Sequence, residues 1–508
     1  MSDEPNHQER SKLDRAFVGG VAWTSAAKWL TQLISWPSVL ISARLLSPAD
    51  FGLVEMAGFY FIVTNVMSEF GIGMTVLQMR ELDMAVAAQL NTIALLSGVA
   101  AFGVSVAAAP WIADFFHSPQ LNRLVVITSL SFILTALQSI PLALLQRDLN
   151  YRRLAIAETA QAIITALVSV SCAFAGFAYW SLIAGNLAGR TANIALTNFW
   201  CPVRFAMPRW KEVIAPLRFG SEIAVQRIIG SISFQSDGMV IGRVMGQASL
   251  GAYRMAINLA STPTDKIGAL IMRVTGPLFA RVQSDKDLLR RYFLIFTEAL
   301  AMVIFPLVFG LTMVAPEAVH LLMGPNWDAA IAPLQWLAAF MAVRTMGYLV
   351  NQLLPALRFT RYGMWMSFVT FALMPIGFYI ASRWGVGAVS ATWLALSPIT
   401  FTLPTIKVLR AIHCGFRQYI GSLMPALAGS AAMVLATLGV RMWPAFAGWP
   451  VAVRLAVEVA AGGAAYGCVI WGFYRDRVKR YWHFFLQLRR SREAAMEGVA
   501  GKEGMLTR

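Results

Sequence analysis

The sequence predicts an all-α membrane protein with two pseudo-symmetric six-helix lobes and about two further helices at the carboxyl end. Three observations lead to this prediction. Of the 508 residues, 57% are hydrophobic and only 13% are charged, whereas a soluble domain carries about 25% charged residues. The apolar residues form long blocks with short polar breaks between them. One stretch also recurs later in the chain, as expected of a duplicated bundle.

The apolar blocks are long enough to cross a bilayer. A spanning helix needs about 20 mostly apolar residues, and in lipid every backbone N–H and C=O must find its partner inside the protein. We expect twelve to fourteen such helices. The fourteen candidates are 17–43, 51–76, 86–112, 122–146, 154–175, 178–200, 216–241, 249–275, 291–314, 329–356, 361–381, 386–406, 418–440 and 451–473.

Lysine and arginine are unevenly shared between the two sets of loops. The loops on the amino-terminal side, together with both tails, contain 29 of them, and the opposite loops contain six: Arg44, Arg123, Arg243, Arg383, Arg441 and Arg454. Basic loops stay in the cytoplasm, so both termini are predicted to be cytoplasmic. The net charge of +16 is thereby explained as an orientation signal, and no nucleic-acid partner is expected.

The first sixteen residues and the cysteines argue against a cleaved signal peptide, a disulfide framework and a metal site. Residues 1–16 are polar and lack the apolar core of a signal peptide, so no cleavage is expected. The four cysteines are scattered without a CxxC spacing, which argues against a disulfide framework or a zinc site. We expect no metal and no cofactor.

An internal repeat divides the chain into two lobes. The segment ARLLSPADFGLVEMA from Ala43 aligns with GRVMGQASLGAYRMA from Gly242 at an offset of 199 residues, and a second match at an offset of 209 aligns Arg152 with Arg361. The first offset contains an even number of spans, so the lobes are parallel, and repeats of this kind place a substrate site between them. The expected parts are a cytoplasmic tail 1–16, an N-lobe 17–200, a linker 201–215, a C-lobe 216–406, two spans in 418–473 and a basic amphipathic tail 474–508 on the cytoplasmic leaflet.

Five motifs lie between residue 43 and about 330: ARLLSPADFGL, SEFGIGMTVLQ, PLALLQRDLNYRRLA, SDGMVIGR with ASLGAY, and LLMGPNW. Together they resemble the polysaccharide (Wzx-like) flippase family of the multidrug/oligosaccharidyl-lipid/polysaccharide exporter superfamily. The resemblance implies a V of two lobes around a cationic central cavity. It also implies that an undecaprenyl-diphosphate-linked oligosaccharide is flipped, by alternating access, from the cytoplasmic to the periplasmic leaflet of a bacterial inner membrane. Whether a polymerase and a chain-length regulator also bind is left open.

Charged side chains inside predicted spans are the candidate site residues. Each costs roughly 2.5–3.5 kcal/mol at a helix centre, so it should face protein or a water-filled cavity. The offset of 199 maps Lys28 onto Arg227. We hypothesise that these two cations grip the diphosphate, because arginine offers two parallel donors and lysine a point charge. The alternative is that each pairs with a carboxylate or reaches a lobe surface.

The same offset maps Glu55 onto Arg254, and a pair between them could close an outer gate. A local pair of Arg254 with Asp237 is the slightly favoured alternative. Three weaker candidates can also be explained by pairing inside one lobe: Arg190 and Arg344 for substrate binding, and Glu298 for gating or ion coupling. Asp265 is a further candidate for gating or ion coupling, because it and its neighbour Lys266 point about 100° apart on a helix, so at least one of them should face the cleft.

The energy source is the least constrained feature. The chain has no G-x-x-x-x-G-K-[ST] motif, so ATP hydrolysis is not expected. A coupling proton or sodium ion would use carboxylates such as Glu55 or Asp237, and coupling to neither is also possible.

Three alternative functions fit the sequence less well. An enzyme of sugar-chain assembly is not expected, because the one D-x-D sequence, Asp285-Lys286-Asp287, lies in a short cytoplasmic loop without a soluble domain. A drug or cation antiporter of the same superfamily would favour an acidic cavity over one with equivalent cations. A flippase for the lipid-linked peptidoglycan precursor would also be expected to have a cationic cavity, and it is the nearest alternative.

Overall fold

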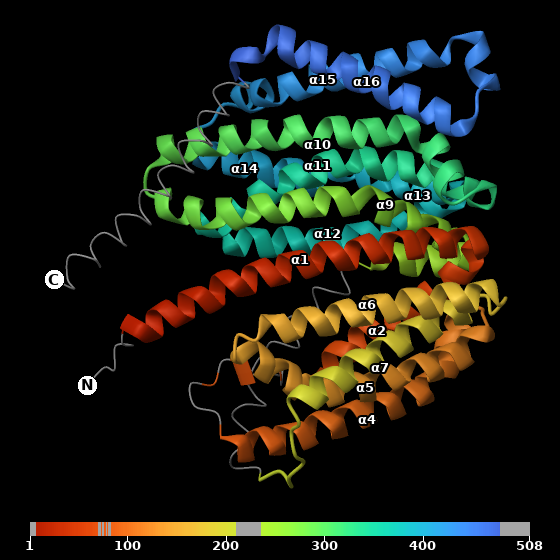
Figure 1. Cartoon of the computed structure of the whole chain (residues 1–508). Helices are drawn as coiled ribbons and strands as arrows, with labels where there is room; N and C mark the ends of the chain where they lie inside the picture. Colours follow the sequence, from red (N-terminus) through yellow and green to blue (C-terminus); the bar gives the residue numbers. More distant parts are fainter. Residues whose placement is uncertain are drawn as a thin grey trace. The chain divides into compact units, whose positions relative to one another are not determined.

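The computed structural model describes residues 7–69, 73, 76, 77, 79, 83–209 and 235–477, without the side chains of 7–22, 24–26, 60–69, 445 and 447. In this part of the chain all regular structure is helical, and short turns join the helices (Figure 1). Nine of its helices are long and apolar enough to cross a membrane. The prediction of an all-α membrane protein is confirmed, and the chain is a multi-pass membrane protein.

The chain divides into two compact units. The first contains the residues up to Arg254 together with Leu322–Ala329 and Phe378–Val386. Its helices are α1 (His7–Leu45), α2 (Pro48–Glu69), α4 (Met84–Phe115), α5 (Gln120–Arg147), α6 (Tyr151–Phe174), α7 (Trp180–Trp200) and the first part of α9 (Ser236–Val282). It also contains the 3₁₀ turns η1 (Pro325–Ala330), apart from its last residue, and η2 (Ser382–Trp384).

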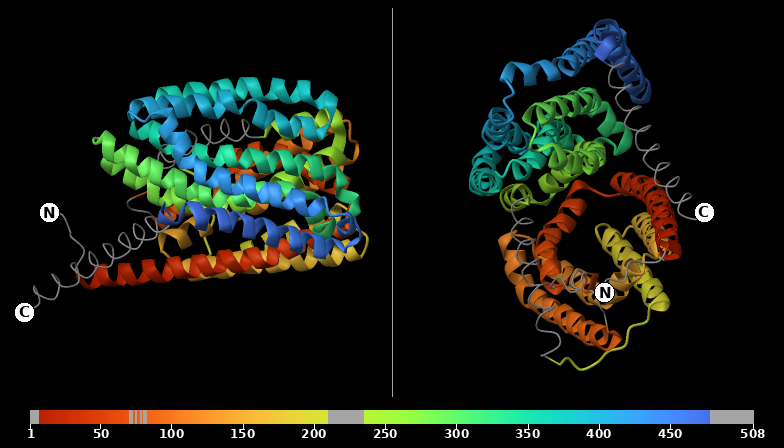
Figure 2. Two further views of the ribbon diagram at one scale, coloured as in Figure 1. Left: turned by 90° about the horizontal axis from the view of Figure 1, so that it is seen from above. Right: turned by 90° about the vertical axis from the view of Figure 1, so that its left-hand side faces the viewer.

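The second unit contains the remainder of α9 and the later helices. Apart from Leu322, the last four residues of α12 and Val386, which belong to the first unit, these are α10 (Lys286–Leu322), α11 (Ile331–Ala356), α12 (Thr360–Ala381), α13 (Val386–Ala395), α14 (Leu403–Ala411), α15 (Phe416–Arg441), the turn η4 (Pro444–Gly448) and α16 (Val451–Phe473). Within each unit the long helices run roughly parallel or antiparallel to one another (Figures 1 and 2). The division into lobes at 201–215 stays a prediction.

Most predicted spans correspond to a helix within the described ranges. Span 216–241 lies largely outside those ranges. The span at 386–406 differs in detail, because α13 and α14 are joined by a π-helical turn, η3 (Pro398–Thr402). Pro398 and Pro404 have no N–H to donate, so the regular i to i−4 ladder is interrupted between the two helices.

Close packing in the first unit depends on small residues. A Cβ at Gly185 would lie 2.8 Å from the carbonyl oxygen of Thr165, and one at Gly189 would lie 2.7 Å from that of Gln161. The backbones of α6 and α7 therefore approach closely, which is how membrane helices associate without a hydrophobic driving force. Helix α1 packs along the α6 side of this pair.

In the second unit, one arginine ties three helices together. Arg441 Nε donates to Glu458 Oε1 at 2.7 Å, and its Nη2 donates to Glu317 Oε2 at 2.8 Å and to the carbonyl of Met313 at 2.7 Å. Arg441 ends α15, Glu458 belongs to α16, and Glu317 and Met313 belong to α10. The α15–α16 hairpin is thereby fastened to α10.

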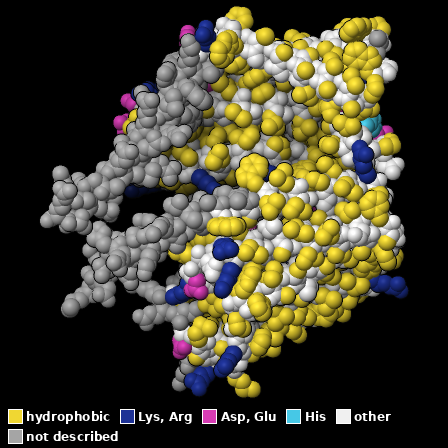
Figure 3. Space-filling model, in the orientation of Figure 1, with side chains coloured by type: hydrophobic (Ala, Val, Ile, Leu, Met, Phe, Trp, Pro, Cys, Tyr) yellow, Lys and Arg dark blue, Asp and Glu magenta, His cyan; other side chains and the backbone are white. Residues whose placement is uncertain are grey.

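The described surface is largely apolar. Hydrophobic side chains cover most of the face in Figure 3, and lysines and arginines stand mainly toward its margins. Large exposed examples on different helices include Trp111, Leu167, Phe199 and Trp471. Soluble monomers rarely expose such extensive apolar surface, whereas a lipid-facing surface requires it.

Candidate functional site

Arg254 lies in the first unit between two carboxylates. Its Nε is 3.6 Å from Glu55 Oε2 on α2, and its Nη2 is 3.9 Å from Asp237 Oδ1 near the start of α9. The side chain of Arg254 is 13% exposed. The two pairings that the sequence offered as alternatives therefore occur together. We call Glu55, Asp237 and Arg254 the α2–α9 cluster.

Aromatic and amide groups complete the surroundings of the guanidinium. It stands over the ring of Phe59, 4.9 Å from the ring centroid, and donates to the side-chain oxygen of Gln235. A Cβ at Gly238 would lie 2.3 Å from Phe59 Cζ and 2.6 Å from Arg254 Nη2. Glycine at this position leaves the space in which the cation and the ring meet, an attractive arrangement in a dry environment.

The two carboxylates of the cluster differ in how firmly they are held. Asp237 is 1% exposed and accepts hydrogen bonds from the Tyr253 hydroxyl at 2.6 Å and from the N–H of Gly238 at 2.7 Å. Glu55 is 38% exposed, and its contact with Arg254 is too long for a hydrogen bond. Glu55 is thus the member that can exchange its partner, while Asp237 stays fixed on α9.

The charges of this cluster do not cancel. Two carboxylates face one guanidinium, which leaves one net negative charge among groups that are mostly out of water. In a low dielectric such an excess of negative charge attracts a cation. The cluster therefore has the chemistry for both uses that the sequence suggested, a gate and an ion-coupling site, and these uses remain predictions.

A second charged group occurs in the second unit. Arg344 Nη2 on α11 is 3.3 Å from Asp265 Oδ1 on α9, and the Tyr348 hydroxyl donates to the same oxygen at 2.6 Å. The guanidinium also lies 5.9 Å from the centroid of the Tyr348 ring. Arg344 and Asp265, both predicted from the sequence, are thus joined through a tyrosine that sequence reasoning did not single out.

Tyr348→Phe should lower the free energy of unfolding by about 1 kcal/mol, because it removes one hydrogen bond while Asp265 keeps its arginine. The measurement is thermal unfolding of the purified protein in detergent. Tyr379→Phe serves as the control, since Tyr379 is exposed on α12 and should show no change. Equal melting of the Tyr348→Phe variant and the parent protein would contradict the prediction.

The other predicted residues are separate from these clusters. Arg190 on α7 donates to Asn186 at 3.0 Å and to Thr135 of α5 at 3.2 Å. Glu298 on α10 accepts from Arg477 at 3.1 Å. Each of these contacts lies within one unit, and the roles of Arg190 and Glu298 in binding and coupling stay predictions.

Of the two cations proposed to bind the diphosphate, only Lys28 lies among the described residues. Lys28 lies at an exposed position of α1, and no carboxylate of a described residue pairs with it. Arg227 lies outside the described residues. Their joint role stays a prediction.

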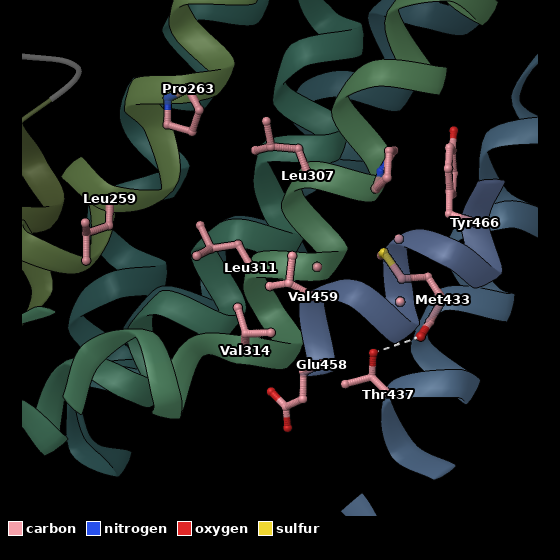
Figure 4. Close-up of a pocket in the computed structure, with 14 residues that line it drawn as sticks. Leu259, Pro263, Leu307, Leu311, Val314, Met433, Thr437, Glu458, Val459 and Tyr466 are labelled. Atoms are coloured by element: carbon pink, nitrogen blue, oxygen red, sulfur yellow. Dashed lines mark hydrogen bonds between the residues drawn. The ribbon is translucent and has the colours of Figure 1, made fainter. Parts of the chain in front are cut away.

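An apolar cavity of about 440 Å³ lies in the second unit (Figure 4). Leu259, Leu307, Leu311, Val459 and Tyr466 line it from α9, α10 and α16, and Met433 lines it from α15. Polar groups stand at one end, where Glu458 lies and the Thr437 hydroxyl donates to the carbonyl of Met433 at 2.9 Å. Sequence reasoning missed this cavity, because hydropathy does not tell which spans pack together.

Within the ranges given above, no group of three or more His, Cys, Asp or Glu side chains is arranged to hold a metal ion.

Comparison with known proteins decides the family. The profile of a family described as "Polysaccharide biosynthesis protein" matches residues 41–332, more than half of the chain. The chain belongs to the polysaccharide biosynthesis protein family. The resemblance drawn from the five motifs is thereby confirmed.

Several known proteins are similar to this chain over most of their length. The lipopolysaccharide biosynthesis protein WzxC of Escherichia coli K12 is 25% identical over 427 residues, which cover 80% of this chain and 84% of WzxC. The succinoglycan biosynthesis transport protein ExoT of Rhizobium meliloti is 29% identical over 332 residues, 64% of this chain and 66% of ExoT. The teichuronic acid biosynthesis protein TuaB of Bacillus subtilis is 23% identical over 467 residues, which cover 89% of this chain and 95% of TuaB.

Solved structures place this member of the polysaccharide biosynthesis protein family in a known fold. The lipid II flippase MurJ in an inward closed conformation superposes with a TM-score of 0.67 at 12% identity, over 90% of this chain and 99% of MurJ. An inward-facing MATE multidrug transporter superposes with a TM-score of 0.59 at 14% identity, over 75% of this chain and 95% of the transporter. At these identities the likeness establishes a shared transporter fold and no more.

Proposed function

We propose that this protein flips an undecaprenyl-diphosphate-linked oligosaccharide from the cytoplasmic to the periplasmic leaflet of a bacterial inner membrane, by alternating access. The observation that carries the proposal is the family match over residues 41–332 in a multi-pass helical chain. Relatives named for lipopolysaccharide, succinoglycan and teichuronic acid biosynthesis support it, and one is itself named a transport protein. Such a substrate is a precursor of O-antigen, exopolysaccharide or capsule, and the protein moves it without chemical change.

Each part of the substrate has a counterpart in the chain. The diphosphate is anionic, so Lys28 and Arg227 are proposed to bind it, with Arg254, Arg190 and Arg344 as further cations along its route. The isoprenoid chain is apolar, and the cavity in Figure 4 offers it an apolar lining. The saccharide needs a wet route across the membrane, which two lobes that open alternately would provide.

The proposed setting follows from the same features. The distribution of basic loops favours an inner-membrane orientation with both termini in the cytoplasm. A polysaccharide polymerase and a chain-length regulator are proposed partners, since they would receive the flipped units on the periplasmic side. Membrane lipids surround the apolar surface.

A fluorescence assay tests the proposal. Purified protein is reconstituted into liposomes that contain an undecaprenyl-diphosphate-linked oligosaccharide with an NBD label on its sugar, and external dithionite then destroys every label it can reach. Liposomes with the protein should lose label from both leaflets, whereas empty liposomes lose only the outer label. NBD-phosphatidylcholine is the specificity control and should stay protected inside. Protection of the oligosaccharide label in the presence of folded protein, with proton and sodium gradients each imposed, would refute the proposal.

Lys28→Met should slow this transport about tenfold, because one charge-assisted contact to the diphosphate is lost. The melting temperature should not change, since Lys28 is exposed and unpaired among the described residues. Lys286→Met, an exposed lysine at the start of α10, is the matched control and should transport normally. Normal transport by the Lys28→Met variant would remove Lys28 from the proposed site.

A further inference from the structure

Two arginines at equivalent positions of the repeat make the same kind of contact. Arg44 Nε, in the last turn of α1, donates to the carbonyl of Leu322 at 3.1 Å. Arg243 Nη1, in α9, donates to the carbonyl of Phe115 at 2.5 Å. Leu322 is the last residue of α10 and Phe115 is the last residue of α4. Each arginine thus caps the carboxyl end of a helix.

The capped carbonyls are natural acceptors. The last four C=O groups of a helix have no partner within it and carry the negative end of the helix dipole, so a guanidinium there is stabilising. The two capping contacts link the repeats in opposite directions. Arg44 belongs to the first copy and holds a helix of the second copy, and Arg243 of the second copy holds a helix of the first.

Between these caps, α2 and α9 touch backbone to backbone. A Cβ at Gly52 would lie 1.7 Å from the carbonyl oxygen of Gln247, and a Cβ at Gly251 would lie 1.8 Å from that of Pro48. Gly52 and Gly251 are equivalent in the repeat, and so are Pro48 and Gln247. The contact therefore has a local two-fold symmetry, and neither glycine can carry a side chain without separating the helices.

A buried tryptophan fills the same region. Trp327 is fully buried, donates from Nε1 to the carbonyl of Ala43 at 2.7 Å, and sets its ring edge-on to Phe51 at 5.3 Å. Ala43, which accepts this hydrogen bond, precedes Arg44 in the chain. Two hydrogen bonds, from Trp327 to Ala43 and from Arg44 to Leu322, therefore join the end of α1 to the end of α10 and the segment after it. On the other side, Arg243 also contacts the ring nitrogens of His117 at 2.6 and 2.7 Å and lies over the ring of Phe115.

From this symmetry we infer that Arg44 and Arg243 are paired latches that hold the two repeats together at their periplasmic end. Both latches release when the protein opens outward. The inference rests on the proposed function only in that alternating access requires this end to open. The periplasmic location follows from the distribution of basic loops. The two arginines are positioning residues, since they hold helix ends and do not bind substrate.

Thiol labelling tests the latches without any substrate. Met56 is fully buried on α2, where it borders Gly242–Gln247 of α9. In a variant whose four cysteines are replaced by serine, Met56→Cys reports on this contact through its rate of reaction with an impermeant methanethiosulfonate added to spheroplasts. Arg44→Gln and Arg243→Gln should each raise the rate about tenfold, because each removes the charge-assisted hydrogen bonding of a guanidinium to a helix end in the closed state. The double variant should react faster than either.

Controls separate opening from misfolding. Arg123→Gln removes an exposed arginine of the same predicted side and should leave the rate unchanged. Gly52→Ala should raise the rate through a different cause, the clash with Gln247. Each variant must elute as the parent does on size exclusion, and Arg→Lys at each latch should restore part of the protection.

The outcomes are decisive for the latches separately from the transport proposal. If Arg44→Gln and Arg243→Gln label at the parental rate while Gly52→Ala labels fast, the arginines are not latches. If labelling rises as expected but no oligosaccharide is flipped in liposomes, the latches stand and the proposed substrate is wrong.

Discussion

Arg254→Met should abolish transport and lower the free energy of unfolding by about 3 kcal/mol. The arginine is the only cation of the α2–α9 cluster, and removing one partner of a buried ion pair leaves an uncompensated charge. Most of this loss in the free energy of unfolding comes from Asp237, which is 1% exposed and cannot be hydrated, whereas Glu55 can turn toward water. Transport is lost because Glu55 and Asp237 would then repel each other wherever α2 and α9 must meet.

Second substitutions separate the roles of the two acids. In the Arg254→Met background, Asp237→Asn should recover most of the lost stability, since it neutralises the buried carboxylate. Glu55→Gln should recover little, because Glu55 is part-exposed. Thermal unfolding in detergent measures both. Arg273→Met, an exposed position of α9, is the control and should melt like the parent. Equal recovery by both second substitutions would show that burial does not distinguish the two carboxylates.

A charge swap asks whether the Glu55–Arg254 contact is a gate. Glu55→Arg combined with Arg254→Glu rebuilds the pair in reverse, and Asp237→Asn must accompany it, since Asp237 would repel the new glutamate. If the contact closes the outer end, this triple variant should transport better than Arg254→Glu alone. Failure of the swap in a protein of normal stability would favour a local role of Arg254 with Asp237.

The second large effect is expected at Arg441. Arg441→Met should lower the free energy of unfolding by about 3–5 kcal/mol, because Glu317 and Glu458 would both remain buried without their cation. The α15–α16 hairpin would lose its ion pair to α10 at this end. Limited proteolysis at the turn 442–450 and thermal unfolding both report this loss, and cleavage there should precede cleavage elsewhere.

Neutral replacements distinguish charge from packing at this site. The triple variant Arg441→Met, Glu317→Gln, Glu458→Gln removes all three charges with similar volumes, and it should melt close to the parent. Arg417→Met, at an exposed position of α15, is the matched control. If Arg441→Met alone melts like the parent, the ion pairs contribute nothing and the hairpin is held by apolar contacts.

The membrane class and the helices could be predicted from the sequence because both depend on local composition. A run of apolar residues in lipid has no stable choice but a helix, so predicted spans such as 122–146 and 451–473 match α5 and α16 closely. The exception at 386–406 has a local cause too. Pro398 and Pro404 interrupt the backbone hydrogen bonds of the helix there, and hydropathy alone does not reveal this interruption.

Partner choice was predictable only in part. The repeat singles out Glu55 and Arg254, and counting residues back from the turn near Gly246 places Asp237 at the depth of Arg254, but no local rule decides between two carboxylates at similar depth. The structure shows Arg254 between both. Arg441 was assigned only to an outer loop, because positive charge near a span end normally reports orientation. Of its two acids, Glu458 lies on the next helix, whereas Glu317 lies on α10, 124 residues away in the sequence.

The sequence by itself determined that this protein is a helical membrane protein of the polysaccharide flippase type, since hydropathy, charge bias and recurring motifs are properties of the chain read in order. Tertiary structure alone decided which helices meet. It produced the symmetric contact of Gly52 with Gly251, the capping of α4 and α10 by two arginines, and the apolar cavity against α16. These features depend on the directions in which side chains of distant helices point, and helices that are apolar on most faces leave those directions open until they pack.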